Sequence, residues 1–219
     1  MSNDNFNSEM KDYYNERAPV YDRVYRYAER QTDLRILESI VTEKFSNKRV
    51  LEVAAGTGYW TQFISGRAHS VVATDATSTA LDQLRRRQLK CPVQTEIIDA
   101  YELHNITQTF NAAFAGLWFS HIPIERRSEW FNSLHSRLDT GSKVILIDNS
   151  NAQCDRLPLS HTDDQGNTYQ DRQTDSGNSY RVLKNFPTEY ELTNELAPFG
   201  TKPTFLELEN FWYFEYEAL

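Results

Sequence analysis

The stretch Arg49–Trp60, RVLEVAAGTGYW, most constrains what this chain can fold into. Its first part, Val50–Val53, is too short for a helix and sufficiently β-branched for a buried parallel strand. The small residues of Ala54–Gly58 let the backbone turn sharply and let a ligand approach main-chain N–H groups. An amphipathic segment begins at Tyr59. The order strand, glycine loop, helix places unpaired N–H groups and the positive end of a helix dipole at the tip of the strand, so we expect a nucleotide-like ligand there.

Two kinds of protein use such a turn. Dinucleotide-binding domains have G-x-G-x-x-G, but Thr61 stands where the third glycine would be. The arrangement Glu52-x-Ala54-x-Gly56-x-Gly58 instead resembles the first motif, E/D-x-G-x-G-x-G, of class I S-adenosylmethionine (SAM) dependent methyltransferases. Ala54 replaces the first glycine of that motif, and its side chain is small enough for the cofactor to pass.

Acidic residues follow the next two expected strands. Asp75 lies about 20 residues beyond the glycines, where the acidic residue of a βαβ unit accepts hydrogen bonds from the two ribose hydroxyls. Thr77 or Ser78 supplies an N-cap for the next helix, which leaves Asp75 free, although an aspartate in this place often only caps a helix. The third strand ends at Asp99 and Tyr101. The resemblance implies that Asp99 and Ala100 hold the adenine, with Tyr101 or Leu103 beside the ring. The alternative is a turn-capping aspartate.

The fourth expected strand, Phe110–Phe119, leads to Ser120 and His121. The string LWFSHIP resembles the fourth motif of bacterial small-molecule methyltransferases, and the Asn/Asp-Pro-Pro-Tyr motif of the enzymes that methylate DNA or glutamine is absent. His121 is the candidate general base, because an imidazole with a pKa near about 6.5 suits removal of a proton from a hydroxyl or ammonium nucleophile. A substrate contact and a purely structural histidine remain open.

The N-terminal region is a Ser/Asn/Asp-rich leader of no expected structure followed by short helices that bend at Pro19. The string YYNERAPVYD resembles the N-terminal lid of small-molecule methyltransferases. The resemblance implies that Tyr14 and Tyr21 close over the cofactor, with Arg17 near its carboxylate. The alternative is that these tyrosines pack on the core with their hydroxyls in water.

The polar segment 151–185 is expected to form a hairpin-like insertion on the substrate side, since it contains turn signals and period-two stretches. Four of its side chains are candidates for binding an acidic or polar substrate or simply face solvent: Arg172, Tyr180, Arg181 and Lys184. Asp148 and Asn149, at the end of the fifth strand, are expected either to contact substrate or to cap a helix.

After a capping box formed by Thr188 and Glu191, the chain ends in two strands joined by a turn at Glu209 and Asn210. A βαβ series closed by an antiparallel pair is how class I methyltransferases complete their sheet. We therefore expect an α/β, Rossmann-like methyltransferase fold: a mostly parallel seven-stranded sheet with a C-terminal antiparallel pair and an N-terminal helical lid. One domain is expected, divided into leader and lid (1–46), cofactor-binding core (47–150), polar insertion (151–185), and last helix with the strand pair (186–219).

The amino-acid composition limits the kinds of partner that we expect for this chain. A net charge of −8 repels phosphate backbones and argues against nucleic acid. No apolar run approaches the roughly 18 residues of a membrane span. Cys91 and Cys154 lack metal-site spacing, so no metal is expected. A cytoplasmic protein is expected by default. The resemblance implies a small-molecule substrate, and we expect a monomer or homodimer.

The resemblance implies SAM-dependent methyl transfer to an oxygen or nitrogen of a small molecule, with His121 near the nucleophile. By the same resemblance, the cofactor contacts are Tyr14, Arg17, Tyr21, Glu52, Ala54, Gly56, Thr57, Gly58, Trp60, Asp75, Ala76, Asp99, Ala100, Tyr101, Leu117 and Trp118. The alternatives are a nicotinamide-dependent oxidoreductase and a non-catalytic protein that binds SAM or its demethylated product, S-adenosylhomocysteine (SAH).

Overall fold

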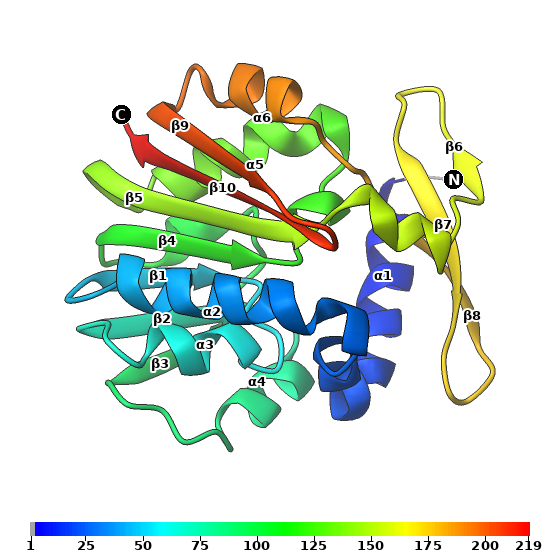
Figure 1. Cartoon of the computed structure of the whole chain (residues 1–219), viewed down its shortest axis with the longest axis horizontal. Coiled ribbons are helices and arrows are strands. Elements are labelled where there is room, and N and C mark those ends of the chain that lie inside the picture. Colours follow the sequence, from blue (N-terminus) through cyan, green and yellow to red (C-terminus); the bar gives the residue numbers. More distant parts are fainter. Residues whose placement is uncertain (1–2) are drawn as a thin grey trace.

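A seven-stranded sheet runs through the centre of the molecule (Figure 1). The computed structural model describes residues 3–219, with side chains from residue 9 onward. The strands of the sheet are β1 (Arg49–Val53), β2 (Ser70–Asp75), β3 (Val93–Ile97), β4 (Phe110–Gly116), β5 (Leu138–Asn149), β9 (Gly200–Glu207) and β10 (Phe211–Ala218). Their order is β3-β2-β1-β4-β5-β10-β9; the first five are parallel, and β10 is antiparallel to both β5 and β9. The predicted fold class is confirmed.

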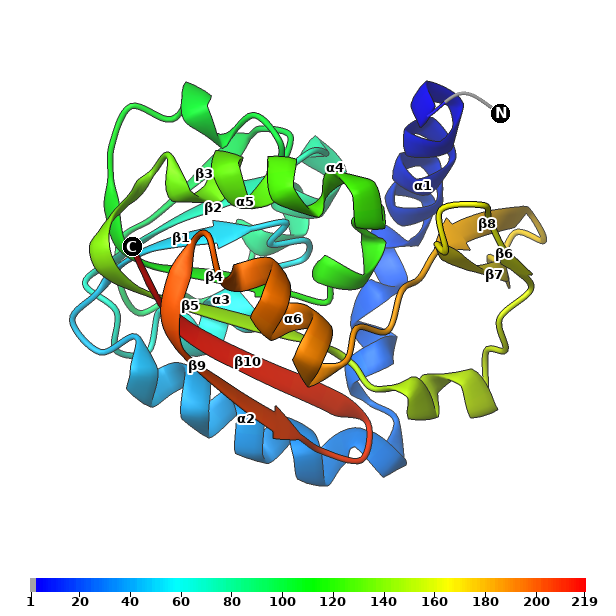
Figure 2. The same cartoon turned by 90° about the horizontal axis from the view of Figure 1, so that it is seen from above.

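Helices cover both faces of the sheet (Figure 2). One face is covered by α2 (Gln31–Lys44), α3 (Tyr59–Ile64) and α4 (Ser78–Leu84), and the other by α5 (Arg127–His135) and α6 (Glu189–Leu196). Successive side chains of a strand point to opposite faces. Val50 accordingly packs with α2 and α3, whereas Leu51 packs with α5 and α6. The near-continuous apolar run of β1 is thereby explained, because both of its faces are buried.

The strand order reverses between β1 and β4, and ligands of open α/β sheets bind at such a switch point, outside the carboxyl ends of the strands. The loop after β1 turns there through positive φ angles of 57° at Gly56 and 77° at Gly58. A Cβ at Gly58 would lie 2.5 Å from Cγ of Leu84, so this glycine lets the loop pack closely against α4.

The N-terminal segment lies across these strand ends (Figure 1). It consists of α1 (Asn3–Arg17), a 3-10 segment η1 (Ala18–Tyr25) and a short turn η2 (Ala28–Arg30). The bend predicted at Pro19 is present, since Pro19 stands at the start of η1. The expectation that the leader has no structure is wrong from Asn3 onward, where α1 begins; residues 1–2 lie outside the described part.

The polar insertion forms a separate three-stranded sheet beside α1 (Figures 1 and 2). Its strands are β6 (His161–Thr162), β7 (Thr168–Gln173) and β8 (Ser179–Leu183). The carboxylate of Glu16 on α1 accepts hydrogen bonds from Ser176, from Asn178 at 3.1 Å and from the Tyr180 hydroxyl at 2.9 Å. The insertion therefore holds the lid helix in place, and Tyr180 serves this contact.

The remaining elements are short. They are η3 (Leu103–Asn105), η4 (Phe119–His121), η5 (Ile124–Arg126) and η6 (Asn151–Asp155). The predicted capping box is confirmed: the Thr188 hydroxyl accepts from the Glu191 amide while the Glu191 carboxylate accepts from the Thr188 amide. In the portion that the structure describes, none of the helices combines the length and apolar character needed to cross a bilayer.

A buried ion pair joins the insertion to the main sheet. Lys184, directly after β8, donates to Asp148 Oδ1 of β5 at 2.7 Å and to the Ser120 hydroxyl at 2.6 Å. Both charged side chains are almost inaccessible to solvent. Burial lowers the pKa of Lys184 to about 8. Asp148 does make the helix-end contact, since its Oδ2 accepts from the Ser120 amide of η4 at 3.0 Å. The expected contacts of Asp148 and Lys184 with substrate are not seen, because both side chains are buried and lie outside the pocket lining.

Replacing one partner of this pair should destabilise the fold. Asp148→Leu leaves the Lys184 charge buried without a counter-ion, which costs about 3–5 kcal/mol, whereas the double variant Asp148→Leu/Lys184→Met should recover most of that loss. Urea unfolding measures both, with Asp139→Asn, which removes an exposed ion pair with Arg49, as the control expected to cost less than about 1 kcal/mol. A single variant as stable as the wild type would contradict this account.

Candidate functional site

A pocket opens at the carboxyl ends of β1 to β4, beneath α1 and η1. Its empty space, counting the open mouth, is about 1100 Å³, which is room for a nucleoside-sized ligand and a second small molecule. All the residues predicted to touch the cofactor, and His121, line this pocket except Arg17 and Gly58. Arg17 instead donates to the Tyr13 hydroxyl at 2.5 Å. Gly58 serves loop packing, as described above.

Asp75 holds the glycine loop. Its Oδ2 accepts from the Gly56 amide at 3.0 Å, and its Oδ1 accepts from the Thr77 amide and hydroxyl, each at 3.0 Å. The expectation that Asp75 is left free is wrong, because the Thr77 side chain bonds Asp75 instead of capping α4. A carboxylate has about four acceptor positions, so Asp75 retains capacity for a ligand hydroxyl.

Glu52 lies at the base of the pocket and is almost completely buried. Its Oε2 has no hydrogen-bond partner among the described residues. Burial raises the pKa of Glu52 to about 8. The side chain is therefore a neutral acid at pH 7 with a free oxygen, and it suits a ligand that brings a hydrogen-bond donor.

Asp99 stands at the mouth of the pocket, two residues beyond β3. Its Oδ1 accepts from the Tyr101 amide at 3.1 Å, and its Oδ2 pairs with Lys11 of α1 at 3.1 Å. The guanidinium of Arg126 lies 3.7 Å from the centre of the Tyr101 ring, which fixes that ring at the pocket wall. Glu52, Asp75 and Asp99 together are called the acid end of the pocket below.

A clamp that the sequence did not reveal ties the lid to the glycine loop. Asp22 of η1 accepts from the Thr57 hydroxyl and from Arg87 Nη2, each at 2.5 Å, and Arg87 Nε donates to the Thr57 carbonyl at 2.6 Å. Arg87 is the last of three consecutive arginines, which the sequence alone does not distinguish. Only the folded structure, which brings Arg87 together with η1 and the glycine loop, shows that this arginine makes the contact.

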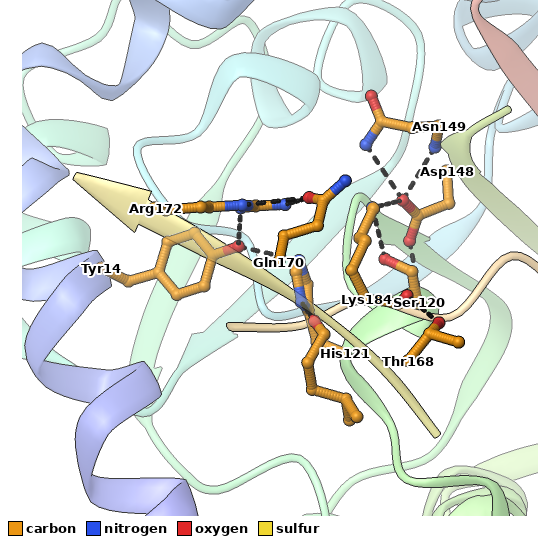
Figure 3. A network of polar contacts seen from close by, with 10 residues as sticks. Tyr14, Ser120, His121, Asp148, Asn149, Thr168, Gln170, Arg172 and Lys184 are labelled. Carbon is orange, nitrogen blue, oxygen red and sulfur yellow. Dashed lines mark hydrogen bonds and ion pairs between the residues drawn. The ribbon is translucent and has the colours of Figure 1, made fainter. Parts of the chain in front are cut away.

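The side of the pocket after β4, called the histidine end below, is formed by Trp118, His121 and Tyr14 of α1. His121 Nδ1 lies 2.6 Å from the carbonyl oxygen of Leu183, so this nitrogen must hold the proton and donate it. Nε2 is then an acceptor and receives the Tyr14 hydroxyl at 2.8 Å (Figure 3). Burial raises the pKa of Tyr14 well above its ordinary value, so the phenol stays protonated.

Arg172 of β7 lies behind Tyr14 (Figure 3). Its Nη1 donates to the Tyr14 hydroxyl at 3.4 Å, and its Nε and Nη2 donate to Gln170 Oε1 at 3.2 and 2.7 Å. Arg181, the other arginine of the insertion, is exposed and pairs with Asp171 at 3.1 Å. Within residues 9–219, no group of three or more His, Cys, Asp or Glu side chains is arranged to hold a metal ion.

The raised pKa of Glu52 implies that the stability of the folded protein depends on pH. The unfolded chain loses the Glu52 proton near pH 4.5, whereas the folded protein keeps it to about pH 8. Between these values the unfolded state binds fewer protons, so stability falls as pH rises. Glu52→Gln cannot ionise, so it should not lose stability over this pH range. At pH 8 the variant should melt at least about 2–4 °C above the ligand-free wild type, and at pH 4.5 it should not. Thermal melts against pH test this, with the exposed Glu102→Gln as control; equal slopes for Glu52→Gln and wild type would refute it.

The comparisons with known proteins agree with this geometry. Residues 50–142 match a family model described as a methyltransferase domain. The structure of DhpI with SAH is 24% identical, covers 99% of this chain and 98% of DhpI, and has a TM-score of 0.81. The DhpI complex with SAM and HEP is 25% identical over 99% of both chains, with a TM-score of 0.80.

A SAM-dependent methyltransferase from Clostridium acetobutylicum is 17% identical, covers 94% of this chain and 98% of its own, and has a TM-score of 0.60. None of the curated proteins matches the sequence. The family match spans β1 to the start of β5, and the shared fold extends over nearly the whole chain. Residues 50–142 therefore match a methyltransferase domain, and nearly the whole chain has the fold of S-adenosylmethionine-dependent methyltransferase structures.

Proposed function

We propose that this protein transfers a methyl group from SAM to an oxygen or nitrogen of a small-molecule acceptor. The observation that carries the proposal is the pocket itself, which is lined by carboxyl groups at or near the carboxyl ends of β1, β2 and β3 and by a tyrosine–histidine pair beside β4. Tyr14 of the lid helix lines the histidine end, and the insertion contacts Tyr14 and His121 from outside the pocket through Arg172 and the Leu183 carbonyl. A pocket beneath a lid helix suits a small acceptor better than a macromolecule.

The residues of the acid end fit SAM. The unpartnered Oε2 of Glu52 can accept from a cofactor donor, and Asp75 keeps acceptor positions for the ribose hydroxyls. Asp99 and the adjoining Ala100 are assigned to the adenine, with the ring of Tyr101 beside it. The cofactor supplies a methyl group activated by a positively charged sulfur.

The protein contributes mainly proximity at the histidine end. In-line displacement requires the acceptor atom and the methyl carbon about 3 Å apart and collinear, and holding them so lowers the barrier by removing freedom of motion. Tyr14 and His121 are the polar side chains of the lining at that end, and they are assigned to orient the acceptor. The interpretation of His121 as general base stays a prediction, and its hydrogen bond from Tyr14 favours a contact role.

Calorimetry with SAH tests the cofactor assignment. We expect the wild type to bind SAH in the micromolar range and Asp75→Ala to bind at least about tenfold more weakly, because hydrogen bonds to a charged group contribute about 1.5–3 kcal/mol. Asp82→Ala removes the same charge from an exposed position on α4 and should bind like the wild type.

Turnover is followed by formation of SAH from SAM in the presence of a mixture of small metabolites. A wild-type protein that ignores SAH at millimolar concentration would refute the proposal. Unchanged binding by Asp75→Ala would refute the role given to that residue while leaving the transfer reaction in place.

A further inference from the structure

The histidine end has no group free to receive a proton. The lone pair of His121 Nε2 is occupied by the Tyr14 hydroxyl at 2.8 Å, while Nδ1 donates to the Leu183 carbonyl. Burial, and then the nearby charges of Lys184 and Arg172, lower the pKa of His121 to about 3. An acceptor that must lose a proton during the reaction would therefore find no base here.

The charges that face His121 come from three elements. Lys184 follows β8 and Arg172 lies on β7, and both disfavour a protonated imidazole; Asp148 of β5 favours one but is already paired with Lys184. Tyr14 on α1 is neutral. The only charge of this group that remains without a counter-ion is that of Arg172.

Arg172 is a buried cation with neutral partners. Only 8% of its surface is exposed, and its guanidinium contacts the amide of Gln170, the phenol of Tyr14 and the side chain of Tyr13. Among the residues whose side chains are described, no carboxylate lies within ion-pairing distance of it. A buried arginine is almost always paired, because an uncompensated buried charge is costly. The matching anion is therefore expected to come from a ligand.

The position of Arg172 points to the acceptor and not to the cofactor. Its contact with the pocket is the hydroxyl of Tyr14, which bonds His121 after β4, whereas the carboxyl groups Glu52, Asp75 and Asp99 belong to β1, β2 and the end of β3 and make no contact with Arg172. An anion would thus be attracted to the side of the pocket where the acceptor must lie, and the sulfonium of the cofactor adds to that attraction.

We propose that the acceptor presents an oxyanion, a carboxylate or a phosphate-type group, and that Arg172 selects it by acting through the Tyr14 hydroxyl. This inference rests on the proposed methyl transfer and specifies its substrate class. An oxygen lone pair of the acceptor forms the new O–CH₃ bond while the S–CH₃ bond breaks, and the electron pair of that bond stays on sulfur. The anion becomes a methyl ester and the sulfonium a neutral thioether, so no proton is released and no base is required.

Arg172 is thus a positioning residue, and its charge is the testable property. The variants are Arg172→Gln, which removes the charge, Arg172→Lys, which keeps it, and Arg181→Gln, which removes an exposed arginine from the same insertion. Calorimetry with SAH comes first. All three variants should bind SAH like the wild type, and failure of the wild type to bind would defeat the proposed function itself.

The second measurement is the melting temperature of the SAH-bound proteins with millimolar acetate, methylphosphonate, inorganic phosphate or uncharged acetamide. At least one oxyanion should stabilise the wild type and Arg181→Gln, while acetamide should not. Arg172→Gln should lose that stabilisation and Arg172→Lys should retain part of it. The inference is overturned if no oxyanion stabilises the SAH-bound wild type, or if Arg172→Gln responds as the wild type does.

The third measurement is methyl transfer from SAM to an equimolar mixture of small carboxylic acids, alkylphosphonic acids, and the corresponding alcohols and amines, read by product mass. Methyl esters are expected, and their identity distinguishes a carboxylate from a phosphate-type acceptor. For the methylated acid, Arg172→Gln should raise KM about tenfold or more with a smaller change in kcat. Methylated alcohols or amines without esters would overturn the inference and leave the transferase assignment standing.

A pH profile separates this account from base catalysis. For a carboxylate acceptor, which is ionised throughout, kcat/KM should be constant between about pH 6 and 9, whereas a base with a pKa in that range would give a rising limb. His121→Gln, whose amide oxygen can accept the Tyr14 hydrogen bond, should keep turnover within about tenfold of the wild type. A loss of several orders of magnitude with a changed pH profile would assign His121 as the base and refute the inference.

Discussion

The hydrogen bond from the Gly56 amide to Asp75 is the interaction on which the geometry of the site depends. It joins the loop after β1 to the end of β2, so two adjacent strand ends are fixed in one arrangement. The positive φ angles of the loop are then maintained against the freedom that glycine would otherwise have. Asp22 and Arg87 also bind this loop, through hydrogen bonds with Thr57 and with each other. These bonds connect the lid to the glycine loop.

The electrostatic character of the pocket changes along its length. The acid end presents carboxyl groups that suit the donors of an adenosyl cofactor, and burial keeps Glu52 neutral until a ligand arrives. The histidine end has a neutral imidazole in a fixed tautomer with the uncompensated charge of Arg172 behind it. Lys184 and Asp148 form a buried ion pair, so neither charge is left uncompensated. The same pair joins the insertion that contains Arg172 to the main sheet.

The sequence was sufficient for the fold because the fold depends on local patterns. Apolar runs, the glycine loop and the capping box of Thr188 and Glu191 are each readable within a few residues. It was also sufficient to name residues that line the pocket, since strand ends of a parallel sheet converge. It was insufficient wherever a side chain has a choice of partners: Thr77 bonds Asp75 instead of capping α4, and Lys184 pairs with Asp148 across the boundary of the insertion. Those choices depend on contacts between segments far apart in the chain.

Helix α1 reaches both ends of the pocket. Lys11 pairs with Asp99 at the acid end, and Tyr14, one turn further along, bonds His121 at the other. A cofactor and an acceptor bound at these two places would therefore contact the same helix. Any coupling between them through α1 would be reciprocal, each changing the affinity for the other by the same factor.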